Sequence, residues 1–214
     1  MISAAEIYSR PPPPPIVFDD REFVVSDEFL AIIKSHCNIE HDSEDVLIRF
    51  YTTTALQSID GYQGEFSAYL TKIGIQQNFP RAKMDYPLIG PYFETENYPV
   101  IDYRGPDGNR VVIDSEDWFD NNTPSGFQIG ISKKIFAVLC SLNVDSRRND
   151  FISIKYYAGI AENLDKLPDD LRYAIALIVR RMYDYRDDTI RLDRTDISGG
   201  VSSILNRYRS KWIG

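Results

Sequence analysis

Apolar residues recur at helical spacing in two segments near the N-terminus. In the first, Ser26 precedes two acidic residues, the pattern of a capped helix start, and an apolar face follows: Phe29, Ile32 and Ile33. The second opens with the acidic run 41–45 and carries an apolar stripe at spacings of three and four residues: Ile48, Tyr51, Ala55, Ile59 and Tyr62. The threonines at 52–54 disfavour a helix locally, so tertiary packing must hold it. We predict two helices between residues 26 and 62.

Between about residue 70 and residue 157 the pattern changes to short β-rich runs, separated by glycine, proline and aromatic residues. The expected strands are residues 72–76, 100–103, 110–113, 135–139 and 151–157, and residues 22–25 are expected to form a short strand or a bend. The sequence GPDGN at 105–109 is a strong hairpin signal between two of these strands. This part of the chain therefore predicts an antiparallel sheet or a small sandwich.

The last third returns to helical spacing. Residues 167–170 form a helix start, with a proline near its first position and acids in its first turn. One long apolar face follows, which we predict to be the core of a helical bundle: Leu171, Ala174, Ile175, Ile178, Met182 and Tyr185. Gly199 and Gly200 are expected to break the chain before a final short helix. That helix can dock on its own bundle or insert into another chain.

The predicted fold class is α+β: a helical bundle of two N-terminal helices and a long C-terminal helix, with an inserted antiparallel β-sheet domain and a short terminal helix. Residues 1–24 form a proline-rich N-terminal arm, and its five prolines at 11–15 favour an extended conformation. That arm serves either as a spacer or as a contact laid along a partner subunit. Residues 25–69 and 160–198 are expected to form the bundle, and residues 70–159 the inserted β-rich domain. Residues 199–214 are expected to form a C-terminal docking segment.

Composition limits the function classes. The 214 residues are 43% hydrophobic and 26% charged, which is typical of a folded domain. The formal net charge of −8 disfavours a protein whose main task is to grip DNA or an anionic membrane. No signal peptide and no stretch long enough to cross a bilayer are recognisable, so we expect synthesis in the cytoplasm. Cys37 and Cys140 lie in apolar runs and are expected to be small buried residues, although a disulfide stays open.

The sequence offers few groups for catalysis. His36 and His41 are the only histidines, without metal-site spacing, and we expect them at the surface or at a helix cap. Phosphate-binding loops, dinucleotide fingerprints and nucleophile elbows are not recognisable. We therefore expect no enzyme activity, no cofactor and no metal. A carboxylate-based hydrolase stays as an alternative because acidic pairs occur at 19–20, 116–117, 169–170 and 187–188.

Aromatic residues are abundant, at 13% of the chain. Many lie in the predicted β region: Tyr86, Tyr92, Phe93, Tyr98, Tyr103, Trp118 and Phe119. Sheet cores use such residues, and so do protein and sugar-binding surfaces. A second alternative is therefore a receptor-binding or carbohydrate-binding virion tail module.

An ordered set of short motifs extends along the chain. Its members are the acidic opening 42–45, Phe79-Pro80, the hairpin from Tyr103 through Asp107-Gly108, YYAG at 156–159, LPDDLRYAI at 167–175, YDYR at 183–186 and LNRYR at 205–209. In this order they resemble the head–tail connector, or adaptor, proteins of tailed bacteriophages and gene transfer agents. The resemblance covers roughly residues 25 to 210 and is most specific from Tyr156 to Arg209. The proline arm and residues 80–98 and 114–130 depart from it.

The resemblance implies a structural, non-enzymatic protein of the virion neck, made in the host cytoplasm. Its copies would form a homo-oligomeric ring, twelve in the family, beneath the portal protein. The ring would extend the channel through which DNA passes without sequence-specific binding, and would present a surface to the next neck or tail protein, with no membrane partner. The resemblance also implies that the C-terminal segment docks on the portal, through Val201, Ile204, Leu205, Arg207, Tyr208, Arg209 and Trp212.

Overall fold

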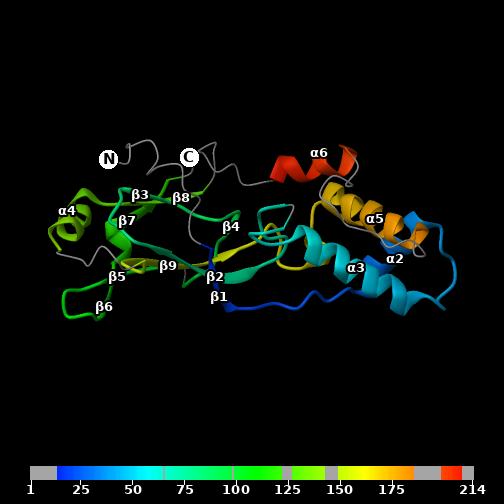
Figure 1. Ribbon diagram of the computed structural model, residues 1–214, viewed down its shortest axis with the longest axis horizontal. Helices are drawn as coiled ribbons and strands as arrows, with labels where there is room; N and C mark the ends of the chain where they lie inside the picture. Colours follow the sequence, from blue (N-terminus) through cyan, green and yellow to red (C-terminus); the bar gives the residue numbers. More distant parts are fainter. Residues whose placement is uncertain are drawn as a thin grey trace. The chain divides into compact units, whose positions relative to one another are not determined.

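The chain folds as an α+β protein. The structure is a computed structural model that describes residues 14–64, 66–97, 99–121, 127–142, 149–185 and 199–208. Within these residues there are five α-helices and two antiparallel sheets, which is consistent with the predicted α+β class (Figure 1). Contacts divide the chain into two units. One joins the chain up to Asp20 to Ile73–Ala158, and the other joins Arg21–Lys72 to the part that begins at Gly159.

The first unit is built around strand β9. Strands β2 (Ile73–Phe79) and β9 (Ile152–Ala158) pair in full register, from Ile73 opposite Ala158 to Phe79 opposite Ile152. The larger sheet has the order β1-β2-β9-β5-β6, with β4 also paired to β9. Its other strands are β1 (Ile16–Asp19), β4 (Tyr92–Phe93), β5 (Val100–Arg104) and β6 (Arg110–Val112). Alternate residues of β2 and β9 are fully buried, as expected for central strands.

The predicted hairpin is confirmed. Strands β5 and β6 pair with Asp102 opposite Val112 and are joined by the turn around Gly108, whose φ is +84°. A positive φ is accessible to glycine at little cost, which explains the GPDGN sequence at this turn.

A smaller sheet in the same unit has the order β3-β8-β7. Its strands are β3 (Asp85–Pro87), β7 (Trp118–Asp120) and β8 (Gln128–Ile131), and a short 3₁₀ turn, η1 (Ser115–Asp117), precedes β7. The strand predicted at 135–139 is wrong, because this segment belongs to helix α4 (Lys133–Ser141). Ser132 caps that helix by accepting a hydrogen bond from the backbone N–H of Ile135.

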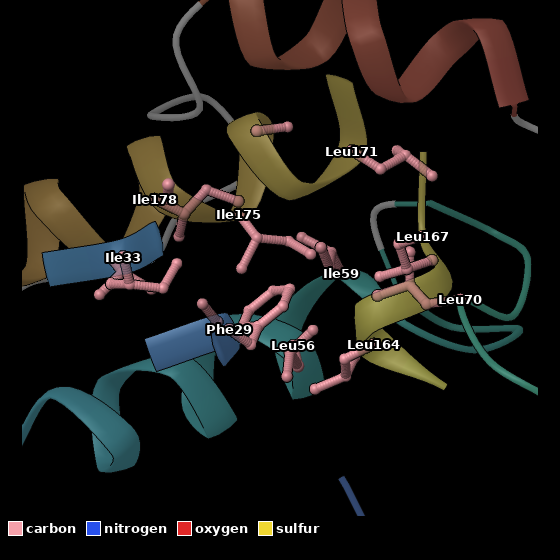
Figure 2. Packing of buried hydrophobic residues seen from close by; sticks show 14 of the residues in the cluster. Phe29, Ile33, Leu56, Ile59, Leu70, Leu164, Leu167, Leu171, Ile175 and Ile178 are labelled. Atoms are coloured by element: carbon pink, nitrogen blue, oxygen red, sulfur yellow. The ribbon is translucent and has the colours of Figure 1, made fainter. Parts of the chain in front are cut away.

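The second unit consists of helices around one apolar core. Its elements are α2 (Asp27–Cys37), α3 (Asp45–Ile59), η2 (Leu164–Lys166), α5 (Asp169–Asp184) and α6 (Gly199–Tyr208). Figure 2 shows Phe29, Ile33, Leu56 and Ile59 from α2 and α3 close to Ile175 and Ile178 from α5. Ser26 caps α2 as predicted, through a hydrogen bond from the backbone N–H of Phe29. Thr52 is fully buried and donates its hydroxyl to the carbonyl of Ile48, which explains how a threonine run fits inside α3.

Two smaller expectations are wrong. Residues 22–25 form neither a strand nor a bend. The strand near the N-terminus is β1, which lies within residues 1–24. Cys37 is half-buried and Cys140 is exposed, and both are free thiols. Cys140 is expected to be buried because it lies in an apolar run, but it belongs to helix α4 and its side chain is exposed. No helix within the described residues combines the length and the apolar character that a membrane span requires.

Candidate docking surface

Helix α6 is the predicted docking element, and it packs against α5 of the same chain. Val201 and Leu205 are buried in the core cluster of the helical unit, with exposed fractions of 2% and 4%. Ile204 and Tyr208 are partly buried and pack against the same cluster. Val201, Leu205 and Tyr208 lie four and three residues apart, the spacing of one helix face. The apolar side of α6 is therefore occupied within its own unit.

The carboxylate of Asp170 links the end of α6 to the start of α5. The Tyr208 hydroxyl donates to Asp170 Oδ1 at 2.7 Å, and Arg207 Nη2 lies 3.3 Å from Asp170 Oδ2. Asp170 also accepts the backbone N–H of Leu171 at 2.9 Å. The hydrogen bond to Asp170 raises the pKa of Tyr208, since it stabilises the protonated phenol beside a negative charge. Asp170 thus links the two helices besides its favourable position in the first turn of α5.

The structure separates the predicted docking residues into two groups. Val201, Ile204, Leu205 and Tyr208 face the chain's own helices, while the side chain of Arg207 is 61% exposed. Arg209 and Trp212 lie outside the described residues. Gly199 and Gly200 were expected to interrupt the chain before the helix, but they are its first two residues. A contact between another chain and Val201 or Leu205 would require α6 to leave α5.

The predicted bundle-core residues of α5 meet the other helices with one exception. The buried members are Leu171, Ala174, Ile175, Ile178 and Met182. Tyr185 is 57% exposed, so its assignment to the core is wrong. The helix ends at Asp184, and Tyr185 is its C-cap with non-helical backbone angles, which takes this side chain off the apolar face.

The histidines and acidic pairs considered for catalysis make contacts with neighbouring side chains. His41 lies within hydrogen-bonding distance of Ser43, 2.8 Å away, and the ring of His36 packs edge-on against Tyr173. Within the described ranges no group of three or more His, Cys, Asp or Glu side chains could hold a metal ion. One member of each described acidic pair anchors an element: Asp19 accepts from Tyr157, Asp117 from Ser132 and Asp170 from Tyr208. Asp187 and Asp188 lie outside the described residues.

The aromatic residues of the first unit, which contains both sheets, differ in how far they are buried. Tyr86 is fully buried, and its hydroxyl accepts the backbone N–H of Lys83 at 2.8 Å. Tyr92 stacks on Phe127 with ring centroids 4.4 Å apart, whereas Phe119 is 49% exposed. Phe93, Tyr103 and Trp118 are half-buried, and Tyr98 lies outside the described residues.

Sequence reasoning missed a buried ion pair at the end of α3. Arg21 pairs with Asp60, and the two side chains are only 11% and 13% exposed. The Arg21 guanidinium also lies over the rings of Phe23 and Tyr69, at 5.1 and 5.4 Å from their centroids. Burial raises the pKa of Asp60, and it raises the pKa of Tyr69 to about 12. Arg21 and Asp60 are 39 positions apart in the sequence, so no local pattern indicates the pair.

Chains of three solved particles share this fold. The first belongs to the neck of an empty gene transfer agent particle computed with C6 symmetry, with a TM-score of 0.61. The others belong to the virion of a native gene transfer agent particle and to the neck of a native particle computed with C12 symmetry, with TM-scores of 0.59 and 0.58. Each is 16% identical in sequence, and the match covers 91% of this chain and 95% of that chain. No protein-family model and no curated protein matches the sequence.

Proposed function

We propose that this protein is a structural, non-enzymatic component of the neck of a tailed phage or phage-like particle, and specifically its head–tail connector. The observation that carries the proposal is the shared fold, which extends over 91% of this chain and 95% of chains from gene transfer agent particles. The ordered motifs of the sequence support the same assignment independently.

In this role, copies of the chain form a ring beneath the portal, extend the DNA channel and offer a surface to the next neck or tail protein. Twelve is the number of copies we propose, in line with the C12 symmetry of one neck that shares the fold. The net charge of −8 per chain suits a wall that DNA must pass without being held, because acidic side chains repel phosphate.

The portal contact is proposed to lie at the C-terminal end of the chain. Since Val201 and Leu205 hold α6 on α5, we assign the contact to the exposed Arg207 and to the residues after it, including Arg209 and Trp212. In this proposal helix α6 stays packed on α5 and holds the docking segment next to the helical unit. Tryptophan and arginine are among the residue types that most often dominate protein interfaces.

The direct test is to mix the purified full-length chain with the portal protein encoded in the same genome and to image the mixture by negative-stain electron microscopy. We expect rings attached to one end of the portal. A non-cognate portal from an unrelated phage serves as the control and should stay bare. Failure to bind the cognate portal at micromolar concentrations would refute the connector assignment, and glycan-array binding by the isolated chain would favour the carbohydrate-binding alternative.

A further inference from the structure

The larger sheet ends in two open edges. Within the described residues, no strand pairs with the outer side of β1 or with the outer side of β6. Every residue of both strands is exposed. Their apolar side chains are 38% to 61% exposed: Ile16, Val17 and Phe18 on β1, and Val111 and Val112 on β6. An open edge with exposed apolar side chains is a template for pairing with a strand of another chain.

The hydrogen-bond pattern of the hairpin shows which backbone groups of β6 face outward. Ile113 donates its backbone N–H to the carbonyl of Ile101 at 2.8 Å. Asp102 and Val112 are the next opposite pair, and they share no hydrogen bond, because bonded and non-bonded pairs alternate along an antiparallel ladder. The backbone N–H and carbonyl of Val112 therefore point away from β5, toward the place of an added strand.

The same alternation identifies Val17 on the other edge. Arg104 donates its backbone N–H to Phe151 at 2.9 Å, so Phe151 and every second residue after it bond toward β5. Tyr156 then bonds toward β2, where it lies opposite Ile75. Since Ile75 uses its backbone groups to bond β9, the opposite residue on β1, Val17, directs its own backbone groups outward.

The two edges match in direction and in side-chain orientation. Four antiparallel pairings connect β1 to β6, through β2, β9 and β5, so β1 and β6 run in the same direction. Val17 and Val111 lie on the same face of the sheet, since their partners Ile75 and Tyr103 pair with β9 residues four positions apart. A copy rotated about an axis along the strands therefore presents its β1 beside β6 of its neighbour, in the orientation that continues the sheet.

We infer that β1 of one copy adds to β6 of the next copy as a parallel strand, so that the larger sheet continues from copy to copy. Each copy offers one β1 edge and one β6 edge, and a ring closed by rotation leaves neither edge open. A strand from an unrelated protein would cover one edge and leave the other exposed. This inference rests on the proposed ring-forming function and names the contact that would build the ring.

The size of the contact favours a ring over a dimer. Strands β1 and β6 have four and three residues, and Pro14 and Pro15, which precede β1, have no N–H with which to lengthen the pairing. A strand pair this short buries much less than the roughly 1,200 Å² of a stable interface. One contact alone is therefore weak, whereas every copy in a closed ring makes two.

The first test cross-links the two edges, both in the free full-length chain and in the chain mixed with the cognate portal. In a Cys37→Ala/Cys140→Ser background, Val17→Cys combined with Val111→Cys should yield a ladder of covalent oligomers with a short bismaleimide. Each single cysteine variant should remain monomeric on a denaturing gel. Dimers from Val17→Cys alone would show that β1 binds itself, and this result overturns the inference.

Exposed apolar residues of α3 provide the control for random collisions. Val46 and Phe50 are 84% and 63% exposed. Val17→Cys combined with Val46→Cys or with Phe50→Cys should give no ladder above the background of the single variants. Ladders as strong as that of the edge pair overturn the inference.

The second test removes the outward N–H of Val112. Val112→Pro abolishes one donor of the open edge and keeps the hairpin bonds, because this N–H points away from β5. We expect the chain concentration that half-saturates the portal to rise about tenfold, whereas Val112→Thr, which keeps the N–H, changes it less than about twofold. Melting curves check that both variants fold, and the cross-linking test decides if the proline variant does not. Equal effects of two folded variants overturn the inference.

Electron microscopy of the cross-linking samples separates this inference from the proposed function. Portal-bound rings without the ladder refute the β1–β6 contact and leave the connector role intact. A ladder in the free chain without portal binding supports the contact and refutes the connector role. The absence of both rings and ladder overturns both.

Discussion

At the residue scale, Asp60 in the ion pair with Arg21 shows how the surroundings of a side chain change its pKa. Burial raises the pKa of Asp60 from its ordinary value of 3.8, and the Arg21 charge opposes that rise. Asp60 also accepts the backbone N–H of Leu70 at 2.7 Å, so one carboxylate joins the end of α3 to the segment that leads into β2. A group in this position makes folding stability depend on pH.

Asp60→Asn tests the direction of that dependence. Because the folded-state pKa is raised, the contribution of Asp60 is fully present below 3.8 and is lost as pH rises through the raised value. We expect the free energy of unfolding of the wild type, minus that of the variant, to fall as the pH rises above about 4, by about 1.4 kcal/mol for each pH unit by which burial raises the pKa of Asp60. Urea unfolding of both proteins across this range measures it. A difference that grows with pH would mean that Arg21 outweighs burial.

Glycine at two turns provides a matched comparison. Gly108 and Gly159 both have positive φ, +84° and +146°, but a Cβ at Gly108 would meet nothing within 4 Å. At Gly159 it would lie 2.5 Å from the carbonyl carbon of Thr71, whose neighbour Lys72 donates its backbone N–H to Ala161. Because a hydrogen bond holds the backbone at Thr71 and Lys72, moving it away from an added methyl group would cost free energy.

Gly108→Ala should therefore lower the free energy of unfolding by about 1 kcal/mol, the cost of positive φ alone. Gly159→Ala should lower it by about 2 to 5 kcal/mol, because strain and overlap add. Chemical denaturation of the two variants gives the comparison. Similar losses would indicate that the Thr71 segment yields to the added methyl group.

At the element scale, long periodic helices and the central strands followed from the sequence, and short elements did not. The spacing of Ile175 and Ile178 predicted α5, and alternation predicted β2 and β9. For helix α4 the sequence predicts a strand, because a five-residue apolar run fits either structure. The deciding signal was the N-cap Ser132, which the sequence displayed. Strands of two or three residues, such as β4, depend on pairing with distant segments and leave no pattern of their own.

The candidate docking helix was predicted with the right apolar face but without its partner. Periodicity shows which side of a helix is apolar, yet it cannot distinguish the chain's own core from another chain. The Asp170 contacts with Arg207 and Tyr208 join positions 37 and 38 residues apart, beyond any local pattern. The exposed pair Val46 and Phe50 did have a local signal, since both are apolar residues outside the main stripe of α3.

Leu205→Ala tests whether α6 is held by its apolar face. Leu205 is 4% exposed, and its truncation should cost about 2 to 5 kcal/mol of packing. We expect amide hydrogen exchange over Gly199–Tyr208 to accelerate at least about tenfold, while exchange in β9 stays unchanged. Ser203→Ala, at an exposed position of the same helix, is the control and should leave exchange as it is. Acceleration spread equally over both segments would point to global destabilisation instead.

At the scale of the whole molecule, the order of short motifs carried more information than any single motif. That order pointed to connectors of phages and gene transfer agents, and chains that share the fold come from gene transfer agent particles. At 16% identity most side chains differ, so packing pattern and element order are what the chains have in common. The adaptor role within the neck stays a prediction, because function lies in surfaces that differ among proteins of one fold.

Removing residues 209–214 separates docking from folding. Deleting all of 199–214 would also remove Val201 and Leu205 from the core, so a loss of binding there would be ambiguous. The shorter truncation keeps α6 and its contacts with Asp170, and we expect its melting temperature to lie within about 2 °C of the full-length value. If Arg209 and Trp212 make the portal contact, affinity for the cognate portal falls at least about 30-fold, measured by biolayer interferometry. Trp212→Ala should reproduce most of that loss, while Ser203→Ala should not. Unchanged affinity in a folded truncation would place the portal contact elsewhere on the chain.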